Sequence, residues 1–367
     1  MKDLDPSVYT IAWIAPLPIE AQAAMHMLDA RHEGGFPLTH GDDYVFRAGE
    51  MCGYNVVIAQ LPREYGTGAA AALASQIKKF FPNLWFTLLV GVAAGLPSAR
   101  RDIRLGDVIV AAPEGDTPGL VAYDLGKETT NGFQLLKAGH VLMPTESVVQ
   151  SAIDSIANEY PDEARLFLPH YNRIKGILHR TGNFADPGQD QDTLYAYDAQ
   201  TDTTSVVSRA PRPTEKRTCI WYGPIGSGER LVKNARVRDD LRDRYHLIGL
   251  EMEAAGTMNR VAAGVIRGVC DYGDEHKNKQ WQPYAAAMAA AYAKAVLDRI
   301  RPLKRAGATV KEKEGGDDAV KPANGGGHGG NDESGASSGH GIYMYNKENK
   351  GQTGTVFSGG HNSFTFN

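Results

Sequence analysis

The sequence predicts an α/β protein whose central sheet is at least partly parallel. Short β-branched or apolar runs alternate with alanine-rich helical patterns through the first 304 residues. Strands that alternate with helices of ten or more residues are typical of sheets with parallel neighbours. The composition, 42% hydrophobic and 22% charged over 367 residues, fits one large globular domain with an appendage.

The elements can be placed in order along the chain. The expected strands lie at residues 9–16, 54–61, 85–93, 106–112, 246–250 and 265–271. The expected helices cover 19–28, 68–81 and 251–263, and a long alanine-rich helix ends near residue 297. The region 180–217 breaks this rhythm because it is rich in turn formers, which predicts either a functional lid or a partly disordered segment.

The composition changes near residue 304. Residues 305–340 are rich in glycine and charge and contain few large apolar side chains, so we expect a disordered tether. In residues 341–367 aromatic and β-branched residues return among Gly, Asn and Gln. This tail is either a frayed terminus or a short β-prone segment able to stack as cross-β.

Charge and cysteine usage exclude several classes of function. The net charge is −4 and no basic block is interleaved with aromatic residues, which argues against a nucleic-acid partner. The three cysteines stand far apart without CxxC spacing, so neither zinc nor a disulfide framework is expected. No run of eighteen apolar residues occurs. We therefore expect a cytoplasmic protein that needs no membrane, metal or cofactor.

Polar groups or glycines follow several of the expected strands. Glu20 begins a helix, Gly91 lies in a buried strand, and Asp271 ends another strand. In an extended segment Glu251 and Glu253 would face the same side, so both carboxylates could bind vicinal hydroxyls. Since ligands sit at the carboxyl ends of strands in such sheets, these places can converge. Each also has a plain structural explanation, such as helix N-terminal electrostatics for Glu20.

Four strings together resemble the nucleoside phosphorylase superfamily, specifically its nucleosidase-like members that serve in fungi as effector domains of immune-receptor-type proteins. The strings are APLPIEAQA (15–23), VGVAAG (90–95), EMEAAG (251–256) and RGVCDYGDEHKNKQWQPYAA (267–286). The resemblance covers about residues 8 to 300. It implies a three-layer phosphorylase-like fold, in which a central mixed sheet is flanked by helices, as a catalytic domain over residues 1–304.

The resemblance also implies roles for individual residues. Glu20 matches the glutamate that positions the attacking water, and Asp271 matches the aspartate that protonates or hydrogen-bonds N7 of the departing purine. Met252 and Glu253 match the pair that contacts the ribose. This site needs an acid near the base and a polar grip on the sugar, because the reaction leaves positive charge on the sugar and negative charge on the base.

Further positions line the two halves of the substrate. Gly91 and Ala93 match the sugar loop, while Ile225 and Gly226 match the segment that lines the base. Many phosphorylases carry a phosphate-binding arginine at the position of Leu89, so this chain is expected to use water as the nucleophile.

The substrate class stays open at this stage. The resemblance favours a purine nucleoside or nucleotide that contains adenine, and ATP is one candidate. Four arginines in expected loops are candidate phosphate ligands, although surface solvation explains them equally well: Arg100, Arg101, Arg104 and Arg212.

Two other functions remain as alternatives, a phosphate-dependent phosphorylase and a non-catalytic signalling module. The joint presence of Glu20, Glu253 and Asp271 favours the enzyme. Relatives imply a homo-oligomer. The tail at 341–367 is similar to amyloid-signalling motifs, which implies a NACHT- or NLR-type receptor as a partner.

Overall fold

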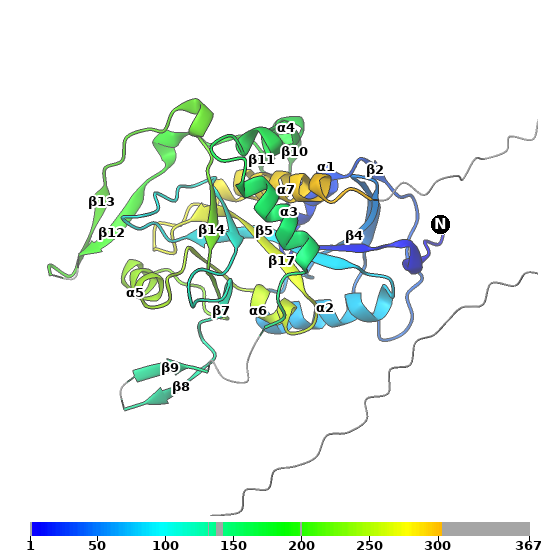
Figure 1. The fold of residues 1–367 in the computed structure, drawn as a ribbon, viewed down its shortest axis with the longest axis horizontal. Helices are drawn as coiled ribbons and strands as arrows, with labels where there is room; N and C mark the ends of the chain where they lie inside the picture. Colours follow the sequence, from blue (N-terminus) through cyan, green and yellow to red (C-terminus); the bar gives the residue numbers. More distant parts are fainter. Residues whose placement is uncertain (1, 131, 137–141, 199, 303–367) are drawn as a thin grey trace, which may run out of the picture. The chain divides into compact units, whose positions relative to one another are not determined.

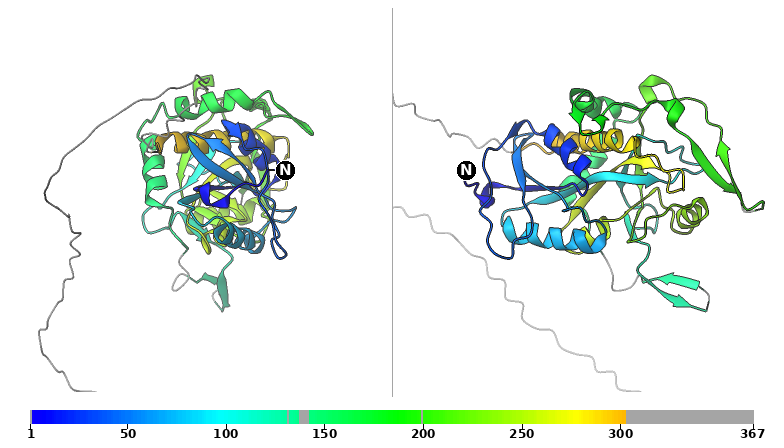
Figure 2. Two further views of the ribbon diagram at one scale, coloured as in Figure 1. Left: turned by 90° about the vertical axis from the view of Figure 1, so that its right-hand side faces the viewer. Right: turned by 180° about the vertical axis from the view of Figure 1, so that it is seen from behind.

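The computed structural model describes residues 2–130, 132–136, 142–198 and 200–302. The predictions for 305–340 and for 341–367 therefore lie outside the described residues. Within them, a mixed sheet lies between two layers of helices, as the sequence predicts (Figures 1 and 2).

The central sheet has one main path of strands. In spatial order these are β14 (Ile220–Gly223), β6 (Val108–Ala111), β17 (Ala263–Asp271), β5 (Phe86–Gly95), β1 (Ile11–Ile14), β4 (Tyr54–Ala59), β3 (Arg47–Met51) and β2 (Ala30–Arg31). The pairs β14–β6, β17–β5, β5–β1 and β1–β4 are parallel, whereas β6–β17, β4–β3 and β3–β2 are antiparallel. The near-continuous apolar runs of β1, β5 and β17 follow from this arrangement, because each is buried between two neighbours and two helical layers.

A short branch of the sheet leaves β5 near its C-terminal end. It comprises β16 (Gly249–Glu251), β15 (Ile225–Ser227) and β7 (Leu120–Ala122). Strand β16 pairs antiparallel with β5, and Leu250 lies opposite Ala94. On the other edge of β5, Asp271 is also paired with Ala94. This branching brings the segment around Glu251 and the end of β17 to the same strand.

Helices cover both faces of the sheet. One layer contains α1 (Pro18–Met27), α3 (Ser147–Ala157), α4 (Ala164–Ile174) and α7 (Trp281–Arg299). On the opposite face α2 (Thr67–Phe80) packs against α6 (Ala254–Met258). Helix α5 (Ala235–Tyr245) contacts a hairpin described below.

The alanine-rich helix α7 packs tightly on β17. A Cβ on Gly268 would lie 2.0 Å from the carbonyl oxygen of Ala285, so the glycine and the small helix residues allow this approach. Nearly every residue from Trp281 to Leu297 is buried. Tight packing of this kind fixes the strand that carries Asp271. Among the helices of the described residues, none combines the length and the apolar character needed to cross a membrane.

The helix expected at 251–263 is shorter than predicted. Helix α6 ends at Met258, and the amides of Arg260 and Val261 close a turn on the carbonyl of Thr257. The chain then enters β17 at Ala263, two residues before the expected start. Ala263, which we expected at the end of the helix, therefore belongs to the strand.

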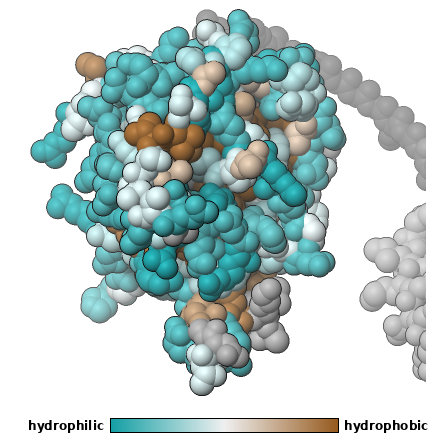
Figure 3. Space-filling view, turned by 90° about the vertical axis from the view of Figure 1, so that its left-hand side faces the viewer, coloured by the Kyte–Doolittle hydropathy of each residue, from teal (hydrophilic) through white to brown (hydrophobic). Residues whose placement is uncertain are grey.

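The region 180–217 forms small ordered elements. They are β11 (Gly182–Asn183), which pairs with β10 (Leu178–His179), the 3₁₀ turns η2 (Gln189–Gln191) and η3 (Thr214–Lys216), and the hairpin β12 (Leu194–Asp198) with β13 (Thr203–Val207). A second hairpin pairs β8 (Gly126–Thr129) with β9 (Gly132–Leu135), and the turn η1 (Pro6–Val8) precedes β1. The face of the molecule on the β12–β13 side is mainly hydrophilic, with a small hydrophobic group near its middle (Figure 3).

Candidate active site

Glu20 lies in the first turn of α1 and uses its two carboxylate oxygens for different purposes. One oxygen, Oε2, accepts a hydrogen bond from the amide of Leu17 (2.6 Å) and so caps the helix. The other, Oε1, accepts from the amide of Val92 in β5 (2.7 Å). Burial raises the pKa of Glu20 to about 7. The positive charge of Arg267 offsets only part of this rise, and the negative charge of Glu253 adds to it. The helix-capping explanation is thus correct for one oxygen, and the other faces the sheet.

Gly91 gives Glu20 and Arg267 the space that they occupy. A Cβ at this position would lie 2.4 Å from Oε1 of Glu20 and 2.5 Å from Nη1 of Arg267. The backbone of β5 therefore approaches both groups more closely than any side chain would allow. Ala93, two residues further along β5, is also buried.

Arg267 is fully buried in β17 and joins the two glutamates of the EME segment. Its Nη2 atom donates to Oε2 of Glu251 and to Oε2 of Glu253, the latter at 3.1 Å. Glu251 also accepts hydrogen bonds from the amides of Glu253 and Ala254, at 3.1 and 2.9 Å. The side chain of Glu251 therefore caps the N-terminus of α6. Glu253 has fewer partners, so it is the carboxylate of this pair that remains for a ligand.

The prediction that Glu251 and Glu253 face one side through alternation along a strand is wrong, although the two carboxylates do lie together. Strand β16 ends at Glu251, and Glu253 precedes α6 with helical backbone angles (φ −118°, ψ −28°). Alternation along a strand therefore does not apply. The carboxylates meet because both bind the guanidinium of Arg267. Met252 lies half-buried between them.

Asp271 ends β17 and is held by three donors. Its Oδ1 atom accepts from the amide of Gly273 (2.9 Å), and its Oδ2 atom accepts from the thiol of Cys270 (3.1 Å) and from Nζ of Lys277 (2.8 Å). Burial raises the pKa of the Cys270 thiol well above its usual range, and the charge of Asp271 adds to this rise. Cys270 therefore stays protonated and acts as a donor, the role that its position beside Asp271 requires.

The three carboxylates predicted for the site lie along the C-terminal half of β5. Arg267, which binds Glu253, lies opposite Gly91 in the pairing of β17 with β5, and Asp271 is paired with Ala94. The C-terminal half of β5 is thus the floor of the candidate site.

The segment predicted to line the base lies beside this floor. Ile225 and Gly226 are buried in β15, where they pair with Gly249 and Leu250 of β16. A Cβ on Gly226 would lie 2.7 Å from side-chain atoms of Leu247 and Leu250, so this strand also depends on close packing. Contact of Ile225 and Gly226 with a base remains a prediction.

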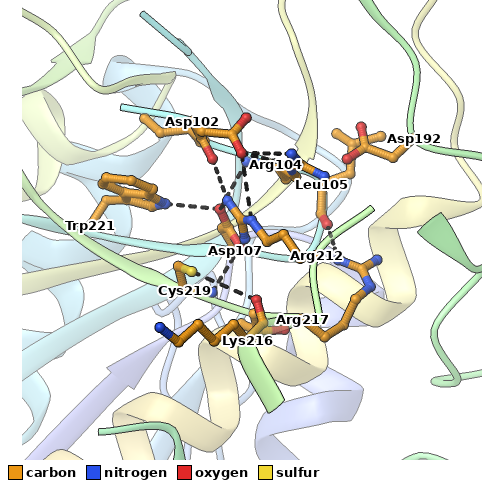
Figure 4. Close-up of polar contacts among 12 residues, drawn as sticks. Asp102, Arg104, Leu105, Asp107, Asp192, Arg212, Lys216, Arg217, Cys219 and Trp221 are labelled. Carbon is orange, nitrogen blue, oxygen red and sulfur yellow. Dashed lines mark hydrogen bonds and ion pairs between the residues drawn. The ribbon is translucent and has the colours of Figure 1, made fainter. Parts of the chain in front are cut away.

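Two of the candidate phosphate ligands are engaged in ion pairs, and the partner of one of them, Asp107, is buried. Arg212 binds Asp107 through two hydrogen bonds, at 2.7 and 3.0 Å, and Arg104 binds Asp102 at 2.8 Å (Figure 4). Asp107 is fully buried and accepts three further hydrogen bonds, from the amides of Arg104 and Cys219 and from the indole of Trp221. This Asp107 cluster connects the 180–217 region to the start of β6, next to β17.

The other two arginines lie nearer to solvent. Arg101 forms an ion pair with Glu114 (2.6 Å), whereas the side chain of Arg100 is exposed. Both follow β5 in the connection to β6. Of the four, Arg100 and Arg101 keep the exposure that contact with a substrate phosphate requires.

The 180–217 region is anchored to the loop that follows Asp271. The hydroxyl of Tyr272 donates to Asp192 (2.6 Å) and accepts from Arg209 (2.7 Å). Arg238 joins the carbonyl of Tyr195 in β12 (2.9 Å) to that of Tyr272 (3.3 Å). A pocket of about 270 Å³ lies between the β12–β13 hairpin, the start of α5 and residues 274–276. This arrangement favours the lid interpretation of the region.

Comparison with known proteins agrees with this fold. The described fold resembles futalosine hydrolase of Helicobacter pylori (TM-score 0.53, 17% identity, 79% of this chain and 98% of that one). It also resembles the 5′-methylthioadenosine/S-adenosylhomocysteine nucleosidases of Helicobacter pylori (TM-score 0.54, 17% identity, 80% and 99%) and Neisseria meningitidis (TM-score 0.52, 17% identity, 79% and 98%). The chain therefore has the fold of these nucleosidases.

One curated sequence relative is much closer in sequence. It is a nucleotide-binding leucine-rich repeat (NLR)-like protein of Hyaloscypha variabilis, 38% identical over 312 residues. The match covers 82% of this chain but 30% of the length of that relative. No family model matches the chain.

Three residues of the site region were not found by sequence reasoning. Arg267 is the single charged residue in the apolar run AGVIRGVC, and a buried arginine requires acidic partners, so that signal was available. Lys277 and Asp107 lie in stretches rich in charge, where no local pattern separates them from surface residues. In the described part of the chain, no group of three acidic, histidine or cysteine side chains is arranged to hold a metal ion.

Proposed function

We propose that this chain is a purine nucleosidase that hydrolyses the N-glycosidic bond of a purine nucleoside or nucleotide. The observation that carries the proposal is that three buried carboxylates, Glu20, Glu253 and Asp271, lie along the C-terminal half of β5. Burial of several acids costs free energy, and buried acids with a raised pKa are typical of sites where the acids serve chemistry. The shared fold with nucleosidases supports the same conclusion.

Each carboxylate has a role that its surroundings suit. Glu20, with a pKa near neutrality, accepts a proton from the attacking water as the water oxygen bonds to C1′. Glu253 accepts hydrogen bonds from the ribose hydroxyls. Asp271 faces the departing base, where a proton or hydrogen bond at N7 stabilises the electron pair released from the broken bond.

Water is the nucleophile in this proposal. Leu89, at the position where many phosphorylases carry an arginine, is fully buried in β5 and offers no charge to phosphate. Arg267, which does lie at the site, is already bound to Glu251 and Glu253. A phosphate-dependent phosphorylase is therefore the second candidate.

The substrate class is a proposal of its own. We place adenine-containing nucleosides and nucleotides first, with ATP among them, since Arg100 and Arg101 could contact phosphates from the connection after β5. The experiment is to incubate the purified chain with adenosine, guanosine, AMP and ATP and to measure release of free base. The Asp271→Asn variant should release base about 10²-fold more slowly with little change in KM.

We further propose that the chain acts as an effector in immunity-like cell-death signalling. The NLR-like relative supports this, because a segment 38% identical to this chain forms part of that longer protein. Assembly as a homo-oligomer, a cytoplasmic location and pairing of residues 341–367 with an NLR-type receptor belong to the same proposal. A non-catalytic module would instead show no base release from any of the four compounds.

A further inference from the structure

The ion pair between Lys277 and Asp271 has no role in the mechanism proposed above. The Nζ atom of Lys277 lies 2.8 Å from Oδ2 of Asp271, and the two side chains are 22% and 2% exposed. Burial disfavours the ammonium, but the charge of Asp271, the neighbouring Cys270 and the hydrogen bond to Asp271 together raise the pKa of Lys277. Lys277 therefore lies beside Asp271 as an ammonium.

This ion pair conflicts with a simple acid role for Asp271. Its two oxygens already accept three hydrogen bonds, from Gly273, Cys270 and Lys277, and all three stabilise the ionised form. Glu20 must be ionised to accept a proton from water, which requires a pH above about 7. A proton carried by Asp271 itself would have to displace one of these three donors. The missing proton is present on Lys277.

We infer that Lys277 is a positioning residue that holds the proton which Asp271 passes to the departing purine. The inference rests on the proposed function, because it needs a base that leaves from the sugar. As the bond from C1′ to the purine nitrogen breaks, its electron pair goes to the base. Nζ of Lys277 gives a proton to Oδ2 of Asp271, and Asp271 passes that proton on to N7.

The protons and bonds of this step balance. Water supplies its oxygen and one hydrogen to C1′, and its other proton goes to Glu20. At the end Glu20 is protonated and Lys277 is a neutral amine. Transfer of one proton from Glu20 to Lys277 through solvent restores the starting state without any further reactant.

Other titratable groups near the pair are few in the described structure. Cys270 lies beside Asp271 and stays protonated, and Glu20 reaches Cys270 electrostatically from α1. Asp274, in the same loop as Lys277, is influenced by Asp271, by Arg238 of α5 and by His276. Of these groups, only Lys277 is a cation in contact with Asp271.

The test compares two substitutions that separate charge from proton donation. Lys277→Arg keeps a cation beside Asp271, but a guanidinium does not give up its proton. Lys277→Met removes the positive charge and leaves Asp271 buried without a cation beside it. Lys279→Met is the matched control, because Lys279 is an exposed lysine of the same loop. Turnover of adenosine and of ATP is measured from about pH 5 to pH 10, with thermal unfolding recorded for each variant.

The inference expects Lys277→Arg to unfold like the wild type, to keep KM within a few-fold and to lose about 10²-fold in kcat at every pH. Lys277→Met should lose as much at pH 9, but its loss relative to the wild type at the same pH should be smaller at pH 6, where solvent supplies the proton that Lys277 no longer holds. Lys279→Met should match the wild type.

Wild-type turnover in Lys277→Arg, or an equal loss at all pH values in Lys277→Met, would overturn the inference and leave the proposed function intact. A wild-type chain that releases no base from either substrate would instead overturn the proposed function, and this inference with it.

Discussion

Glu20 and Gly91 are packed so closely that even a methyl group on the glycine would not fit. The Cβ of an alanine would fall 2.4 Å from Oε1 of Glu20. Since Glu20 is held from its other side by Leu17, it cannot withdraw without losing the helix cap. The glycine at position 91 of β5 therefore fixes the position of Glu20, the proposed general base.

The first prediction follows from this contact. Gly91→Ala should lower kcat/KM for base release by at least about 10²-fold, because the methyl group displaces Glu20 and Arg267, at a cost of about 1–3 kcal/mol in stability. Gly176→Ala is the control, as a Cβ there meets nothing within 4 Å. Full activity in Gly91→Ala would show that the position of Glu20 is unimportant.

The second prediction concerns pH. Burial raises the pKa of Glu20 to about 7, and the protonated carboxyl cannot accept a proton from water. As pH falls below about 7, kcat/KM should therefore decline about tenfold per unit. The Glu20→Gln variant should be slow and lack this acid limb. Circular dichroism at each pH separates the decline from unfolding, and a wild-type rate that stays constant down to about pH 5 would rule out Glu20 as the base.

Sequence reasoning found the catalytic residues of this account but not the network that holds them. Glu20, Glu253 and Asp271 follow strands and carry recognisable strings, so local pattern and resemblance were sufficient. Arg267 acts between segments distant in the sequence, and its partners become clear only when β16 and β17 are placed on β5.

The four loop arginines illustrate the same limit. Arg212 is indistinguishable in the sequence from Arg100, and the difference arises from the buried carboxylate of Asp107, which the fold brings to Arg212. Long-range ion pairs of this kind leave no periodic signal, whereas strands and helices do.

The third prediction separates structural arginines from surface ones. Arg212→Met leaves the buried carboxylate of Asp107 without its cation and should cost about 3–5 kcal/mol in the free energy of unfolding. Arg100→Met should change stability by less than about 0.5 kcal/mol, because its side chain is exposed. Urea denaturation of both variants measures the difference. Equal stabilities would mean that the Asp107 cluster does not hold the 180–217 region.

The fourth prediction concerns the C-terminal tail. Removal of residues 341–367 should leave base release intact but abolish activation by a receptor with a matching motif. A peptide of this segment should form fibrils whose diffraction shows the 4.7–4.8 Å cross-β spacing. A peptide that stays monomeric even when seeded, with a truncated protein that still responds to the receptor, would assign the tail no such role.

The most direct test of hydrolysis follows the oxygen of the attacking nucleophile. The purified chain is incubated with the purine substrate in water enriched in oxygen-18, with and without phosphate, and the sugar product is analysed by mass spectrometry. Hydrolysis predicts free ribose, or ribose phosphate from a nucleotide, that carries the label at C1′, at a rate independent of phosphate. Unlabelled ribose 1-phosphate formed at a rate that rises with phosphate would contradict the account and identify a phosphorylase.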